Sequence, residues 1–100
     1  MQGKKWNVYI GKWYCYDIIY EVNSIEINSN NYAYYDEERA SFEGYVTVKN
    51  STLKIGNKKF TIKKAPQLLD STEQIRLGFT YKMELAGPFG YLGSGTYYRH

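Results

Sequence analysis

The chain is poor in the residues that build disulfide-linked or metal-bound scaffolds. Its 100 residues include one cysteine, Cys15, and one histidine, His100, which is the last residue. A single cysteine excludes an intramolecular disulfide and a zinc site made of cysteines alone. A nucleophilic cysteine needs a base and an electropositive setting, and the only histidine is far away in the sequence. We therefore expect Cys15 to be a small buried core residue.

Long apolar segments and a strong excess of one charge are also lacking. No run approaches the roughly 20 apolar residues of a membrane span, and no basic segment followed by an apolar one opens the chain. The net charge is +3, from 13 Lys and Arg against 10 Asp and Glu. This excess is too small to predict nucleic-acid binding, which normally needs clustered basic residues.

Candidate catalytic and metal-binding groups are equally few. Asp17 and Glu21 are the carboxylates of the aromatic segment 10–22, and nothing pairs them with a nucleophile. The acidic run Asp36–Glu38 lacks the alternating carboxylates and the closing glutamate of a calcium loop. The sequence thus predicts a protein that is not an enzyme, with no catalytic residue, no metal site and no cofactor.

Aromatic residues and short alternating segments are what the chain does contain. It has 12 tyrosines, and 18% of its residues are aromatic. A chain of this length forms one domain, here residues 1–100, and buries about 60–65% of the surface that its unfolded form exposes. Apolar and polar residues alternate in short segments separated by turn residues, which is typical of strands. No helix is predicted.

The segment 52–63 predicts a tight hairpin. Gly56-Asn57 suits the centre of a type I′ or II′ turn, and this turn sets Leu53 opposite Phe60. In the same register Lys54 faces Lys59 on the outer side, where like charges slightly destabilise a strand pair. We interpret the two lysines either as part of a patch for an acidic partner, an anionic glycan or a lipid head group, or as protection of an exposed sheet edge.

A second hairpin is predicted over residues 24–36, and one long strand over Ile75–Leu85. In the hairpin, Ile25 and Ile27 are expected to face inward on the first arm, and Tyr32 and Tyr34 on the second. The segment 75–85 alternates without a fault, with a bend or bulge expected at its glycine. Residues 65–70 are expected to form an irregular link.

The strands follow one another in sequence order, with short turns between them. Segments 42–50 and 95–99 and the aromatic segment 10–22 supply the remaining strands, which makes seven or eight in all. Sequential antiparallel strands form a meander, and a meander of this size with strongly apolar inner faces either closes into a barrel or splits into two sheets. We therefore predict an all-β fold, an antiparallel meander closing into a small seven- or eight-stranded barrel.

Two ends of the chain carry a family resemblance. Gly11-Lys12-Trp13 at the start of the first strand resembles the G-x-W signature of lipocalins and related calycin barrels, and Arg99 resembles the basic residue that ends their last strand. The resemblance implies that Trp13 packs under Arg99 and so closes the barrel. It is nearest to short lipocalin-like domains of bacterial secreted proteins and lipoproteins, which implies a periplasmic or extracellular location, with a lipid anchor on the full-length precursor.

Two functions follow as expectations. The resemblance implies a small binding domain that holds an apolar or amphipathic ligand in the barrel, and Tyr16, Tyr34, Phe79 and Tyr81 are our predicted lining. The alternative is a protein-interaction or inhibitor-type barrel with a filled core, which binds a protein partner through its rim or outer surface. Tyrosine suits either function, because it combines a flat apolar face with a polar tip.

Overall fold

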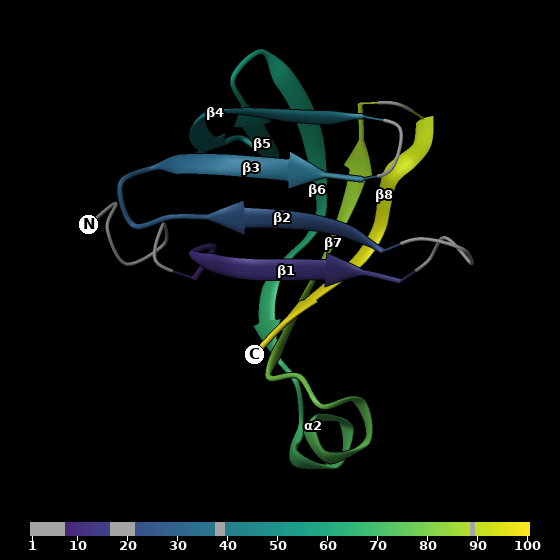
Figure 1. The fold of residues 1–100 in the computed structure, drawn as a ribbon. Helices are drawn as coiled ribbons and strands as arrows, with labels where there is room; N and C mark the ends of the chain where they lie inside the picture. Colours follow the sequence, from purple (N-terminus) through teal and green to yellow (C-terminus); the bar gives the residue numbers. More distant parts are fainter. Residues whose placement is uncertain (1–7, 17–21, 38–39, 89) are drawn as a thin grey trace.

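The computed structural model describes residues 8–16, 22–37, 40–88 and 90–100. Eight antiparallel strands form a closed barrel, in which each strand pairs with its sequence neighbours and β8 returns to pair with β1. Strands β1–β4 make one wall, and β6–β8 cross behind them (Figure 1). This architecture confirms the predicted all-β antiparallel meander and sets the number of strands at eight.

The strands differ in length, from 4 residues in β5 to 11 residues in β6. They are β1 (Gly11–Cys15), β2 (Asn23–Ile27), β3 (Tyr32–Asp36), β4 (Ser41–Lys49), β5 (Thr52–Ile55), β6 (Lys58–Leu68), β7 (Tyr81–Gly87) and β8 (Gly90–Arg99). In the described part of the chain one helix, α2 (Ser71–Leu77), connects β6 to β7 and projects from one end of the barrel (Figure 1).

The barrel interior is occupied by side chains from all eight strands. Alternate residues of each strand point inward, and the fully buried large side chains include Trp13, Tyr35, Phe60 and Tyr97. The Nε1–H of Trp13 donates a hydrogen bond of 2.9 Å to the carbonyl oxygen of Tyr9, so the buried indole is satisfied at its polar end. Cys15 is buried and forms no disulfide.

The hairpin of β5 and β6 has the predicted register. Leu53 is paired with Phe60, and Lys54 with Lys59. Gly56 has a φ of 59°, as the first central residue of a type II′ turn requires. A Cβ atom on Gly44 would lie 2.6 Å from the Cα of Gly56, so glycine allows β4 to pass close to this turn.

The predicted inner face of β3 is wrong. Ile27 pairs with Ala33 and Ile25 pairs with Tyr35, so Ala33 and Tyr35 face the core. Tyr34 therefore points outward and is 41% exposed. A shift of one residue in side-chain parity moves every side chain of a strand to the other face, and the prediction had chosen the larger side chains over Ala33.

The predicted strand over Ile75–Leu85 is wrong in its first part, which is the helix α2. The side chain of Asp70 accepts a hydrogen bond of 2.8 Å from the backbone N–H of Glu73, which caps the helix N-terminus. Gly78, with a φ of 77°, ends the helix and forms no bulge. Ile75 is 85% exposed, so its place in the alternating pattern did not reflect burial.

The predicted irregular link over residues 65–70 is also wrong, because β6 continues to Leu68. The pairing of β6 with β7 changes register between Lys64 and Gln67. Pro66 falls in this irregular stretch, where a residue without a backbone N–H interrupts no regular ladder. Asp17 and Glu21, the carboxylates of the aromatic segment, lie outside the described residues.

Candidate functional site

Arg99 lies between two aromatic rings where the barrel closes. Its guanidinium carbon is 5.3 Å from the ring centroid of Trp13 and 4.2 Å from that of Tyr81. The ladder between β1 and β8 pairs Tyr14 with Tyr98 and Cys15 with Tyr97. The stacked arginine therefore extends the contact between the first and last strands beyond a short ladder.

The residues predicted to line the barrel lie in three separate places, and the structure does not bring them together as a lining. Tyr81 is half-buried beneath Arg99. Tyr16 is 52% exposed on the outside of the barrel, where it contacts Phe79 at a ring distance of 6.1 Å. Tyr34 is on the outer face of β3.

Phe79 is the centre of an outer aromatic cluster near the end of β8. Its ring lies 5.5 Å from that of Tyr98 and 4.7 Å from that of His100. Tyr14 and Tyr16 stack on each other at 6.3 Å and complete the group. We call these residues, Tyr14, Tyr16, Phe79, Tyr98 and His100, the Phe79 cluster.

A second aromatic group lies on β3 and β4, and we call it the tyrosine triad. Tyr32 meets Tyr34 at 5.4 Å and Tyr45 at 5.0 Å, both edge to face. Tyr45 is 71% exposed. The hydroxyl of Tyr32 donates a hydrogen bond of 2.8 Å to Oε2 of Glu43, and this bond raises the pKa of Tyr32 above its ordinary value. The triad is thus an exposed group of rings held in place by mutual contacts and a carboxylate.

An open hollow of about 360 Å³ adjoins the triad on the outer face of β1–β4. Its charged side chains are three carboxylates, those of Glu26, Asp36 and Glu43, and one ammonium group, that of Lys12. Oδ1 of Asp36 accepts a hydrogen bond of 2.7 Å from the Ser41 hydroxyl. The complete lining is Lys12, Ser24, Glu26, Tyr34, Tyr35, Asp36, Ser41, Phe42 and Glu43.

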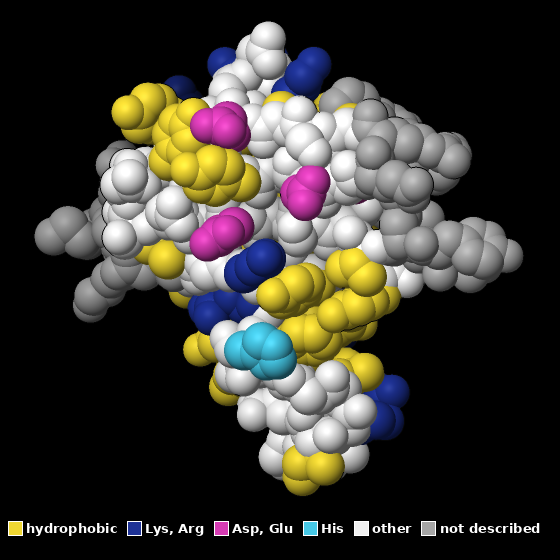
Figure 2. Space-filling view, in the orientation of Figure 1, with side chains coloured by type: hydrophobic (Ala, Val, Ile, Leu, Met, Phe, Trp, Pro, Cys, Tyr) yellow, Lys and Arg dark blue, Asp and Glu magenta, His cyan; other side chains and the backbone are white. Residues whose placement is uncertain are grey.

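The strand register explains why these side chains converge. Lys12 pairs with Glu26, Glu26 with Tyr34, and Tyr34 with Glu43, so one outward row crosses all four strands. Figure 2 shows this face: hydrophobic side chains gather in two areas, over β3–β4 and below β1, and acidic side chains lie over the same wall. The β1–β4 wall thus combines exposed rings with an excess of negative charge.

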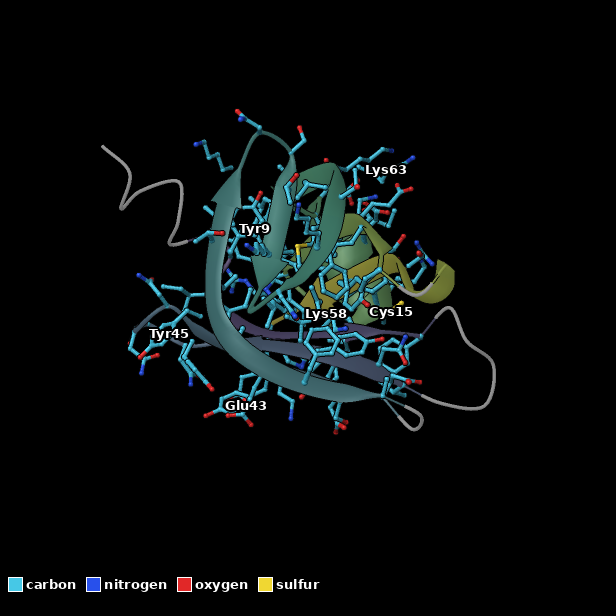
Figure 3. All side chains as sticks on the ribbon, turned by 90° about the horizontal axis from the view of Figure 1, so that it is seen from above. Tyr9, Cys15, Glu43, Tyr45, Lys58 and Lys63 are labelled. Carbon is cyan, nitrogen blue, oxygen red and sulfur yellow. The ribbon has the colours of Figure 1, made fainter. Side chains whose placement is uncertain are left out.

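A different chemistry covers the wall made by the second half of β4 with β5 and β6. Up to Lys63, its outward strand residues are lysines and threonines, namely Thr47, Lys49, Thr52, Lys54, Lys59, Thr61 and Lys63, whereas the end of β6 exposes Lys64, Ala65, Gln67 and Leu68. We call this surface the lysine–threonine face. Figure 3 shows Lys63 on the other side of the barrel from Glu43 and Tyr45.

The interior holds a buried polar side chain, that of Asn23, whose amide is left unsatisfied by the described residues. Asn23 is fully buried, and both polar atoms of its amide are without a hydrogen-bond partner among the described residues. An unsatisfied buried amide costs about 1–3 kcal/mol. It lies on β2 opposite Cys15, so this polar group faces the core near the end of β1.

Comparisons of the chain with models of known protein families, with curated proteins and with solved structures found no match. Within the described ranges, no group of three or more His, Cys, Asp and Glu side chains is placed to hold a metal ion. In the same ranges no helix is long and apolar enough to cross a membrane.

Sequence reasoning missed most of the β1–β4 wall. The sequence predicts Tyr32 on the inner face and assigns no role to Glu26 and Glu43. The available signal was that Lys12, Glu26 and Glu43 alternate with less exposed residues in their strands. These residues come together because of which strands lie side by side and in what register. The sequence of a single segment does not carry that information.

Proposed function

We propose that this chain is a non-enzymatic, lipocalin-like barrel that binds a protein partner through the outer face of β1–β4. The observation that carries the proposal is the tyrosine triad, whose rings pack on one another while Tyr45 remains 71% exposed. Tyrosine is enriched at protein interfaces and among the residues that dominate binding energy.

The charge of the wall specifies the partner further. Three carboxylates and one ammonium group line the hollow beside the triad, so a partner with exposed Arg or Lys side chains complements it. A guanidinium or ammonium group also binds favourably over a tyrosine face. The partner that fits this wall is therefore a protein surface rich in basic residues.

The occupied interior favours this function over a ligand held in the barrel. An eight-stranded barrel is just wide enough for its own side chains or for one small ligand, and here large rings from β1, β3, β6 and β8 occupy the core. Asn23 is the observation that favours the second candidate, a small amphipathic ligand, because a polar group of that ligand would satisfy the buried amide.

The test compares three versions of the protein. Partners captured by the wild type are identified, purified and titrated against the wild type, against Y34A/Y45A, and against L68A/I75A. Leu68 and Ile75 are exposed apolar residues away from the β1–β4 wall, so the third version is the matched control. We expect the tyrosine variant to weaken binding at least about 30-fold, because each interface tyrosine contributes on the order of 1–2 kcal/mol.

Two results would contradict the proposal. Equal weakening by both double variants would mean that general exposed apolar surface, and not the tyrosine triad, carries the binding. A small molecule that copurifies, is detected by native mass spectrometry and is lost on denaturation would assign the barrel interior as the binding site instead. In that case N23L should abolish retention of the small molecule.

A further inference from the structure

We propose that the lysine–threonine face is a second binding surface, which docks the protein on an anionic membrane. This surface is separate from the β1–β4 wall, and the proposal does not depend on the function proposed above. The starting point is the pair formed by Lys54 and Lys59, which lie directly opposite each other on β5 and β6.

Closure of the barrel excludes protection of a sheet edge as the reason for this pair. Opposed like charges destabilise a strand pair, and lysines are placed this way in other proteins to keep an exposed edge from pairing with another chain. Here β5 is hydrogen-bonded to β4 and β6, and β6 is hydrogen-bonded to β5 and β7. Because neither strand is an edge, edge protection is wrong as an interpretation of Lys54 and Lys59.

The rest of the face adds further positive charge. Lys49 and Lys63 lie on the neighbouring rows, and β5 and β6 contain no acidic residue. None of the four lysines is ion-paired with a carboxylate in the part of the chain that the structure describes. The outward carboxylate of β4, Glu43, accepts a hydrogen bond from Tyr32 on the other wall. The ammonium groups are therefore available to an external anion.

The shape and composition of the face favour a membrane over a polymer. The lysines spread over three strands in two dimensions, and such a spread matches a surface of headgroups better than a single bound chain. No outward aromatic residue lies on β5 or β6, whereas bases of single-stranded nucleic acid are held by stacking on such residues. Lysine ammonium groups and threonine hydroxyls both donate hydrogen bonds to phosphate oxygens. Each lysine close to an anionic leaflet strengthens binding about 5-fold.

The test measures co-sedimentation of the full chain with vesicles. Phosphatidylcholine vesicles are compared with vesicles that also contain phosphatidylglycerol, at low salt. We expect binding to the anionic vesicles only, and its loss at about 0.3 M salt, where charges are screened within a few ångströms. The variant K54Q/K59Q should lower the partition coefficient about 25-fold. It should fold at least as well as the wild type, because it removes a like-charge contact.

The matched control is R76Q/K82Q, which removes the same net charge from α2 and β7. We expect this control to change the partition coefficient less than about 3-fold, since neither residue belongs to the face. Equal losses in the two double variants, or no binding to anionic vesicles, would overturn the proposal. Loss of membrane binding in Y34A/Y45A would overturn it in favour of the β1–β4 wall. Tighter binding of a soluble polyanion such as heparin through Lys54 and Lys59 would overturn it in favour of a polymer.

Discussion

Replacing Arg99 by methionine should weaken the contact between β1 and β8 and lower the free energy of unfolding. The guanidinium carbon of Arg99 lies 5.3 Å from the Trp13 ring and 4.2 Å from the Tyr81 ring. Methionine keeps much of the aliphatic packing of arginine but has no positive charge. The substitution therefore tests the stacked charge and leaves the size of the side chain nearly constant.

The two ring contacts set the expected magnitude. A cation–π contact contributes about 0.5–1 kcal/mol when exposed and about 2 kcal/mol when desolvated, and Arg99 is half-buried. The Nε atom of Arg99 is buried and has no hydrogen-bond partner among the described residues. Ring stacking is therefore the main interaction of this part of the guanidinium. We expect R99M to lower the free energy of unfolding by about 1–3 kcal/mol. A loss of about 2 kcal/mol lowers Tm by roughly 8–16 °C in a domain of this size.

Urea unfolding followed by circular dichroism measures this loss directly, with R76M as the control. Arg76 is 65% exposed and pairs with Glu73 at 3.8 Å on a surface helix, so its loss should cost less than about 0.5 kcal/mol. A double-mutant cycle of R99M with Y81L should give a coupling energy of about 0.5–1 kcal/mol. The reasoning is refuted if R99M costs no more than R76M, or if the coupling energy is zero.

Three further substitutions test other parts of the fold. G44A should cost about 2 kcal/mol or more in urea unfolding, because the new Cβ would lie 2.6 Å from the backbone of Gly56; an unchanged midpoint would contradict this. D70A should speed amide exchange over residues 71–77 about 5-fold without lowering global stability, because the capping bond is lost from a helix that buries no residue. Burial raises the pKa of Tyr9, so its contribution to stability is complete below about pH 10 and is lost as pH rises through the higher folded pKa. Y9F should therefore reduce the loss of unfolding free energy above pH 10. A pH dependence equal to that of the wild type would contradict this expectation.

Local turn chemistry made the β5–β6 hairpin predictable. Gly56-Asn57 admits few turn geometries, and a two-residue turn fixes the register of both arms. The pairing of Leu53 with Phe60 follows from that constraint. The number of strands and the closed meander were predictable for a related reason, since each short turn leaves consecutive strands side by side.

The faces of β3 and the nature of residues 71–77 were harder to obtain from sequence. In the segment 32–36 both parities contain tyrosine, so hydrophobicity alone does not distinguish the inner face, and only the pairing of Ala33 with Ile27 decides it. For α2 the capping residues Asp70 and Gly78 were a usable signal. The alternation that continues to Leu85 obscured this capping signal. Because α2 buries no residue, it lacks an apolar face that would distinguish it from a strand.

The small interior of the barrel explains why so many aromatic side chains lie on its outer walls. Large rings such as Trp13, Tyr35 and Phe60 are fully buried, and the interior of an eight-stranded barrel is about wide enough for its own side chains. Among the described residues, most of the remaining rings therefore lie at the ends or outside, and apolar surface gathered in a patch often marks an interaction site. They are concentrated on the β1–β4 wall with the carboxylates, while β5 and β6 present lysine and threonine. Neither arrangement is needed to close the barrel, which is why we propose that both serve binding at the outer surface.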